Sequence, residues 1–266
     1  MTHASAALGF IVAAALAGGV LSTIVAASTL RLSRHWVAPL VSFAVGALLG
    51  AVFLELIPHA LETGTPQTVM VTMLAGLLGF FLLEKLVLWR HAHGHEAHAH
   101  DQDETEHDHA LHAGPGAGRP GLMILIGNGV HSFCDGIVIA AAFIADTPLG
   151  VATTIAIVAH AVPQQVGDFA VLLHSGFTRR KAFTFNVAVG LATLVGALAA
   201  YGALADMARA LPVVLAIAAA SLLYVAVADL IPSLHRRPEP LETARQMIAI
   251  LLGIGVIAVA HLALEP

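Results

Sequence analysis

Residues 121–145 read GLMILIGNGVHSFCDGIVIAAAFIA, a stretch of 25 residues in which Asp135 is the only Asp, Glu, Lys or Arg. An apolar helix of about 20 residues crosses the hydrocarbon core of a bilayer. Similar stretches, separated by arginines, prolines or acidic clusters, bring the number to eight: 6–30, 36–60, 67–89, 121–145, 148–174, 182–206, 211–234 and 243–263. The chain is therefore predicted to be an all-α integral membrane protein with eight transmembrane helices in a single domain, residues 1–266.

The composition agrees with this class and excludes others. The chain is 58% hydrophobic and 11% charged, whereas soluble domains are about 25% charged. With 12 Lys and Arg against 17 Asp and Glu, it has no basic surface for nucleic acid. A single cysteine, Cys134, excludes an intrachain disulfide and a cysteine-based zinc finger. No GxxxxGKS or GxxxxGKT loop occurs, so no nucleotide cofactor is expected.

The positive charges predict the orientation. Eleven of the 12 lysines and arginines lie in one set of alternate loops and helix ends: Arg31, Arg34, Lys85, Arg90, Arg119, Arg179, Arg180, Lys181, Arg236, Arg237 and Arg245. The other set holds only Arg209. Because positive loops stay in the cytoplasm, both termini are expected outside.

A weak internal repeat relates the two halves of the chain. Glu55-Leu-Ile-Pro58 in the second segment corresponds to Asp229-Leu-Ile-Pro232 in the seventh. Three helices on each side of a central pair would form a 3+2+3 inverted repeat, as in many secondary transporters. The alternative is that the two motifs are convergent helix ends.

The fourth and fifth segments carry the strongest candidate site. His131 and Asp135 are four residues apart, as are His160, Gln164 and Asp168, so each set shares one helix face. Counted from the ends of their antiparallel segments, the two histidines lie about 15–18 Å deep, near the bilayer midplane. Two imidazoles, a carboxylate and an amide oxygen suit a borderline ion such as Zn²⁺.

Pro163, between His160 and Gln164, is expected to kink the fifth helix and free a carbonyl at this site. The structural alternative is that these polar side chains only hold neighbouring helices together.

Four further polar residues are candidates for the ion pathway: Glu55, His59, Asp168 and Asp229. Glu55 and His59 lie near the outer end of the second helix and suit a metal entrance, although exposed helix-end polarity explains them equally well. Asp229 is expected toward the cytoplasmic end of the seventh helix. Asp168 either lines the exit or orients a metal ligand by a hydrogen bond.

Residues 91–120 are predicted to form a His-rich cytoplasmic loop. Residues 91–113 contain eight histidines and six acidic residues. This composition does not build a core, so the loop is expected to be disordered without metal. It suits exchangeable metal chelation, and the alternative is a solvated linker.

The sequence His131-Ser-Phe-Cys-Asp135-Gly136 resembles the fourth-helix signature of the ZIP (Zrt/Irt-like) metal transporters, His-Asn-x-x-Asp/Glu-Gly. His160-Ala-Val-Pro163-Gln-Gln-Val-Gly167-Asp168 is similar to their fifth-helix signature, His-Glu-x-Pro-x-Glu-x-Gly-Asp, and the run around Tyr224 and Asp229 resembles their seventh helix. The resemblance covers essentially the whole chain. It implies a prokaryotic-type carrier of Zn²⁺ or related divalent cations into the cytoplasm, with the 3+2+3 plan and often a homodimer.

The resemblance also implies which residues bind metal. His131, Asp135, His160 and Gln164 fall where the first metal's ligands lie in the family. The second metal draws on positions that are Ser132, Ala161 and Gln165 here. Since alanine cannot bind metal and serine binds it poorly, one strong metal site is expected.

The function predicted from the sequence is transport rather than catalysis. Zn²⁺, with Fe²⁺, Mn²⁺ or Cd²⁺ as possible alternatives, would be carried as substrate by alternating access. The rival hypotheses are an intramembrane zinc hydrolase with Asp168 as general base, against which stands the absence of HExxH, and a metal exporter. Few lysines and a compact chain indicate a bacterial inner membrane.

Overall fold

The computed structural model describes residues 2–29, 37–92, 119–204, 210–235 and 239–264, and no strand occurs in these ranges. Eight helices are long and apolar enough to cross a membrane: Ala7–Ser28, Ala38–Thr63, Pro66–Leu83, Gly127–Ala145, Thr147–Leu173, Arg179–Ala203, Leu211–Ala228 and Pro240–Ala263. They correspond one to one to the predicted segments, so the prediction of an eight-helix membrane protein is confirmed.

Three of the eight spans contain a π-helical turn. The first consists of α1 (Thr2–Leu16), η1 (Ala17–Leu21) and α2 (Ser22–Thr29). The second consists of α3 (Val37–Gly50), η3 (Ala51–Leu56) and α4 (Ile57–Thr63), and the seventh of α9 (Leu211–Tyr224), η6 (Val225–Leu230) and α10 (Ile231–Leu234). Such turns are rare and frequently accompany functional sites.

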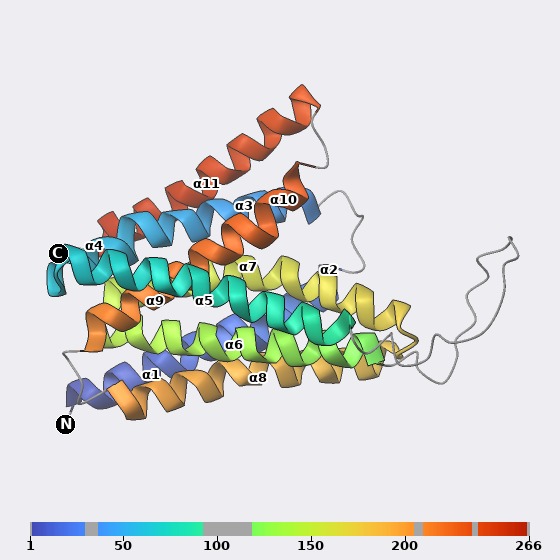
Figure 1. Cartoon of the computed structure of the whole chain (residues 1–266), viewed down its shortest axis with the longest axis horizontal. Helices are drawn as coiled ribbons and strands as arrows, with labels where there is room; N and C mark the ends of the chain where they lie inside the picture. Colours follow the sequence, from blue (N-terminus) through green and yellow to red (C-terminus); the bar gives the residue numbers. More distant parts are fainter. Residues whose placement is uncertain (1, 30–36, 93–118, 205–209, 236–238, 265–266) are drawn as a thin grey trace, which may run out of the picture.

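The other five spans are uninterrupted α-helices: α5 (Pro66–Ala92), α6 (Arg119–Ala145), α7 (Thr147–His174), α8 (Arg179–Leu204) and α11 (Pro240–Leu264). Both chain termini lie at one end of the bundle, and the last residues of α5 and the first residues of α6 lie at the other (Figure 1). Most of the predicted His-rich loop, residues 93–118, lies outside the described residues.

The central helices are held in place by close backbone contacts. A Cβ atom added at Gly136 of α6 would lie 1.9 Å from the carbonyl oxygen of Thr193 of α8. One added at Gly19 of η1 would lie 2.0 Å from the carbonyl oxygen of Gly190 of α8. Only glycine permits these approaches, as is usual where membrane helices pack without a hydrophobic driving force. The contact at Gly136 fixes the position of the neighbouring Asp135.

The two related motifs each begin in a π-helical turn and end in the α-helix that follows it. Glu55 belongs to η3 and Asp229 to η6, and each turn leads into a short α-helix whose second residue is proline. The two motifs therefore share a local backbone form, and the internal repeat stays a prediction.

Candidate metal site

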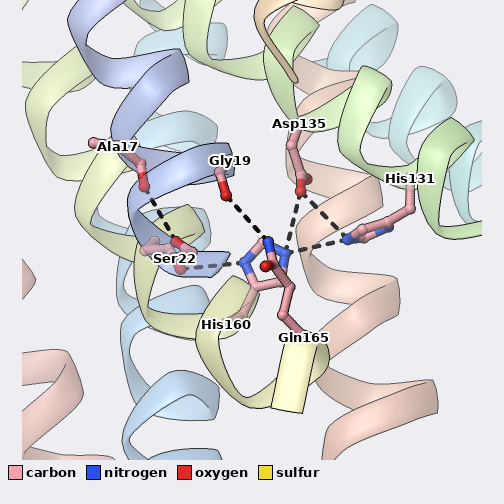
Figure 2. Close-up of polar contacts among 8 residues, drawn as sticks. Ala17, Gly19, Ser22, His131, Asp135, His160 and Gln165 are labelled. Atoms are coloured by element: carbon pink, nitrogen blue, oxygen red, sulfur yellow. Dashed lines mark hydrogen bonds and ion pairs between the residues drawn. The ribbon is translucent and has the colours of Figure 1, made fainter. Parts of the chain in front are cut away.

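Three side chains from α6 and α7 meet in the interior of the bundle. The Nε2 atom of His131 lies 3.2 Å from Nε2 of His160, and each of these atoms lies 3.4 Å from Oδ2 of Asp135 (Figure 2). In the described part of the chain this is the only group of three or more His, Cys, Asp or Glu side chains whose ligand atoms lie within 4.8 Å of one another. We call these three residues the His–Asp triangle.

The dimensions of the triangle suit a tetrahedral metal ion. With bonds of about 2.0–2.1 Å, neighbouring ligand atoms around Zn²⁺ are separated by about 3.3–3.4 Å. The three observed separations of 3.2, 3.4 and 3.4 Å match one face of such a tetrahedron. An ion above this face would leave its fourth position for another ligand or water.

The backbone of α7 offers His160 a hydrogen-bond acceptor. The Nδ1 atom of His160 lies 3.2 Å from the carbonyl oxygen of Ala156. With its proton on Nδ1, His160 donates to that carbonyl and turns the lone pair of Nε2 toward His131 and Asp135. A metal-binding histidine usually donates its other ring N–H to an acceptor of this kind.

The three side chains of the triangle are largely buried, so a charge on any of them is costly. The His160 side chain is fully buried, that of Asp135 is 5% exposed and that of His131 is 20% exposed. The Oδ1 atom of Asp135 is buried and has no hydrogen-bond partner in the described part of the chain. Because an ionised carboxylate inside a membrane is costly, such a residue usually serves a cation or a partner.

The comparisons with known proteins point the same way. The ZIP Zinc transporter family model matches residues 2–120 and 88–261. This chain belongs to the ZIP family. Human zinc transporter ZIP13 is 30% identical over an alignment of 261 residues, and the alignment covers 84% of this ZIP protein and 70% of the human one. The resemblance drawn from the two helix signatures is confirmed.

Other relatives share shorter regions with this ZIP protein. A Drosophila melanogaster homologue of zinc transporter ZIP13 is 32% identical over 148 residues, 54% of this chain and 42% of that protein. Human zinc transporter ZIP4 is 36% identical over 118 residues, 44% of this chain and 18% of that protein. These relatives are named as transporters, in agreement with the prediction that the chain is not an enzyme.

The predicted fourth ligand, Gln164, is not joined to the triangle by a described contact. Its side chain is half-buried on α7. The neighbouring Gln165 is 4% exposed, and its Nε2 donates to the carbonyl oxygen of Gly19 in η1 at 3.3 Å (Figure 2). In this ZIP protein Gln165 therefore connects α7 to the first span.

α7 continues from Thr147 to His174 with Pro163 inside it, so the helix is not broken at this residue, and the expected kink stays a prediction. Proline still lacks the N–H that would bond the Ala159 carbonyl. The carbonyl oxygen of Ala159 is therefore expected to be free because proline has no N–H, and not because the helix is broken.

Asp168 makes a contact that the sequence did not reveal. Its Oδ1 accepts a hydrogen bond from Nδ2 of Asn128 on α6. The suggested hydrogen bond from Asp168 to a metal ligand has no counterpart among the described contacts, and for His160 the described backbone acceptor is Ala156. Asn128 lies three residues before His131 on α6, so the helical periodicity was a signal that could have found it.

The entrance candidates lie in different environments. Glu55 is 1% exposed, so it is not a solvated helix-end residue. Its Oε1 lies 3.1 Å from Nδ1 of His261 on α11, a partner 206 positions away that no local pattern indicates. His59 is half-buried on α4. For Asp229 the structure describes only its backbone position in η6.

Proposed function

We propose that this ZIP protein moves Zn²⁺ into the cytoplasm by alternating access through the His–Asp triangle. As a ZIP family member it is a multi-pass membrane transporter of divalent metal. The observation that carries the proposal is the match between the triangle and one face of a tetrahedral zinc site. Gln164 is proposed as the fourth ligand, because it follows His160 by one turn on the same face.

Three helices on either side of the α6–α7 pair are proposed to form an inverted repeat, with both termini outside. The helix packing supports this proposal. The contact between α3 and α11 corresponds to the contact between α9 and α5. The contact between α3 and α7 likewise corresponds to the contact between α9 and α6. In each comparison the first pair becomes the second when the first three spans are mapped onto the last three and α6 is mapped onto α7. The same mapping places the second span on the seventh, and each of these two spans contains a π-helical turn, η3 and η6.

The membrane potential is a sufficient driving force for uptake. A divalent ion that moves inward at 100 mV, inside negative, gains about 4.6 kcal/mol, at about 2.3 kcal/mol per charge. With Asp135 ionised and both histidines neutral, a bound divalent ion leaves a local charge of about +1. This incomplete neutralisation favours release, which transport requires.

A single strong metal site is part of the proposal. Ser132 and Ala161 occupy positions from which family members bind a second metal, and both are buried. Gln165 is hydrogen-bonded to Gly19 through its amide nitrogen. Neutral Ser, Ala and Gln at these positions offer no carboxylate to a second ion.

Several finer assignments belong to the same proposal. Fe²⁺, Mn²⁺ and Cd²⁺ are possible alternative substrates, since imidazole and carboxylate do not select strictly among them. Asp168, Asp229, Glu55 and His59 are assigned to the ion pathway. Residues 91–120 are proposed to chelate arriving metal. The whole chain is proposed to act as one domain within a homodimer. The membrane is proposed to be a bacterial inner membrane.

The test is uptake of radioactive zinc into proteoliposomes under an inside-negative potential. Wild type should accumulate zinc, and a His131→Ala, His160→Ala double variant should not. The matched control is His235→Ala, an exposed histidine outside the triangle, which should transport normally. If wild-type protein carries neither zinc, iron nor manganese, the carrier proposal is wrong. Flux that runs only outward would make the protein an exporter.

A further inference from the structure

A second polar contact lies between the same two helices as the triangle. Nδ2 of Asn128 on α6 donates to Oδ1 of Asp168 on α7. Asn128 precedes His131 by three residues, about 4.5 Å along the helix, and Asp168 follows His160 by eight, about 12 Å. Since α6 and α7 run antiparallel (Figure 1), the contact is displaced from the triangle toward the start of α6 and the end of α7.

The carboxylate of Asp168 is deeply buried and incompletely bonded. The residue is 6% exposed, and its Oδ2 has no hydrogen-bond partner in the described part of the chain. Three residues close to this pair in the sequence, Phe169 and Leu172 of α7 and Leu125 of α6, belong to one buried apolar cluster. A buried carboxylate with one oxygen left over is expensive at membrane depth and marks a place for a further ligand.

We propose that Asp168 and Asn128 form a second divalent-cation subsite, which receives the metal ion between the His–Asp triangle and the cytoplasm. The inference rests on the proposed function for its direction. Oδ2 of Asp168 offers a carboxylate oxygen to the ion. Without the ion, Asn128 donates from its amide nitrogen to Asp168. Rotation of the Asn128 amide by a half-turn places its oxygen where its nitrogen was, and this oxygen becomes the second ligand of the ion. Two oxygen ligands hold an ion weakly, as a transfer position requires.

The competing explanation is that the contact only ties α6 to α7. Asp168→Asn separates the two, because asparagine has the same shape and keeps an amide oxygen for Asn128 to donate to, while the negative charge is lost. A hydrogen bond that only holds α6 to α7 is kept in the Asp168→Asn variant, whereas a cation subsite is lost.

The first experiment measures zinc uptake by the full chain in proteoliposomes. We expect the Asp168→Asn variant to lose about tenfold or more in rate and Asn128→Ala about threefold, while zinc affinity at the triangle, measured by chelator competition, changes by less than about twofold. Asp146→Asn, which alters a partly exposed aspartate at the start of the same helix, is the control and should transport at the wild-type rate.

The second experiment detects the subsite without transport. Mn²⁺ prefers oxygen ligands, so we would titrate it into the solubilised His131→Ala, His160→Ala variant and follow the free ion by electron paramagnetic resonance. The same variant with Asp168→Asn should bind one Mn²⁺ fewer. The loop at 91–120 is identical in both proteins, so their difference reports Asp168 alone.

The outcomes separate the two proposals. Wild type without any metal flux contradicts the proposed function, yet the Mn²⁺ titration still tests the subsite. Asp168→Asn with wild-type uptake, or equal Mn²⁺ binding by the two variants, overturns the subsite. A loss of zinc affinity as large as that of the His131→Ala, His160→Ala variant also overturns it, since Asp168 would then act through the triangle.

Discussion

The Nε2 atoms of His131 and His160 lie 3.2 Å apart although 29 residues separate them in the chain. If both nitrogens carry a lone pair, two neutral imidazoles repel each other at this distance. The arrangement becomes favourable when a cation lies between their lone pairs and the nearby carboxylate of Asp135.

The first prediction concerns Asp135. The Asp135→Asn variant should bind zinc about tenfold to 100-fold more weakly, because the triangle loses its only negative charge. Chelator competition on the purified protein measures this, with Asp146→Asn as the matched control. The His-rich loop is common to all the proteins, so the difference between them reports the triangle. Unchanged affinity would place the zinc elsewhere.

The second prediction concerns pH. Protons compete with metal for the imidazoles of His131 and His160, so zinc uptake should weaken as the pH on both sides falls from about 7.5 to about 5.5. Because the effect is competitive, the KM for zinc should rise while the maximal rate changes less. Uptake that increases on acidification would contradict simple competition and indicate that protons travel with the metal.

The third prediction concerns helix packing. Gly136→Ala should destabilise the fold strongly, because the new Cβ would lie 1.9 Å from the Thr193 carbonyl oxygen and would push α6 away from α8. Gly129→Ala is the matched control on the same helix, because no atom lies within 4 Å of a Cβ at that position. Thermal unfolding in detergent compares the two. Equal unfolding temperatures would mean that the close contact at Gly136 is not required.

The fourth prediction concerns Glu55 and His261, whose Oε1 and Nδ1 atoms lie 3.1 Å apart. Glu55→Gln and His261→Ala should each lower stability, and the double variant should lose less than the sum of the two. A coupling free energy of about 0.5–3 kcal/mol is expected for a contacting pair. A double-mutant cycle on thermal unfolding measures it. Strict additivity would show that α11 and η3 are not coupled through these side chains.

Parts of the site followed from the sequence. Residues four apart share a helix face whatever the rest of the fold does, so the pairing of His131 with Asp135 was predictable. The depth argument placed His160 at the same level, and in the structure these three side chains meet. Metal binding by His131, Asp135, His160 and Gln164 stays a prediction. For Gln164 and Gln165, helix periodicity favours the first, whereas the structure describes a long-range hydrogen bond only for the second.

The sequence alone determined the number of spans, the class of membrane protein and the family. These are properties of local composition and of short motifs, because the cost of exposing polar groups to lipid acts on each segment separately. Only the tertiary structure decided that Asn128 meets Asp168 and that Glu55 meets His261. Such contacts depend on the rotation and crossing of whole helices, which are set by close approaches such as Gly136 on Thr193 and by the sum of many small packing energies along the chain.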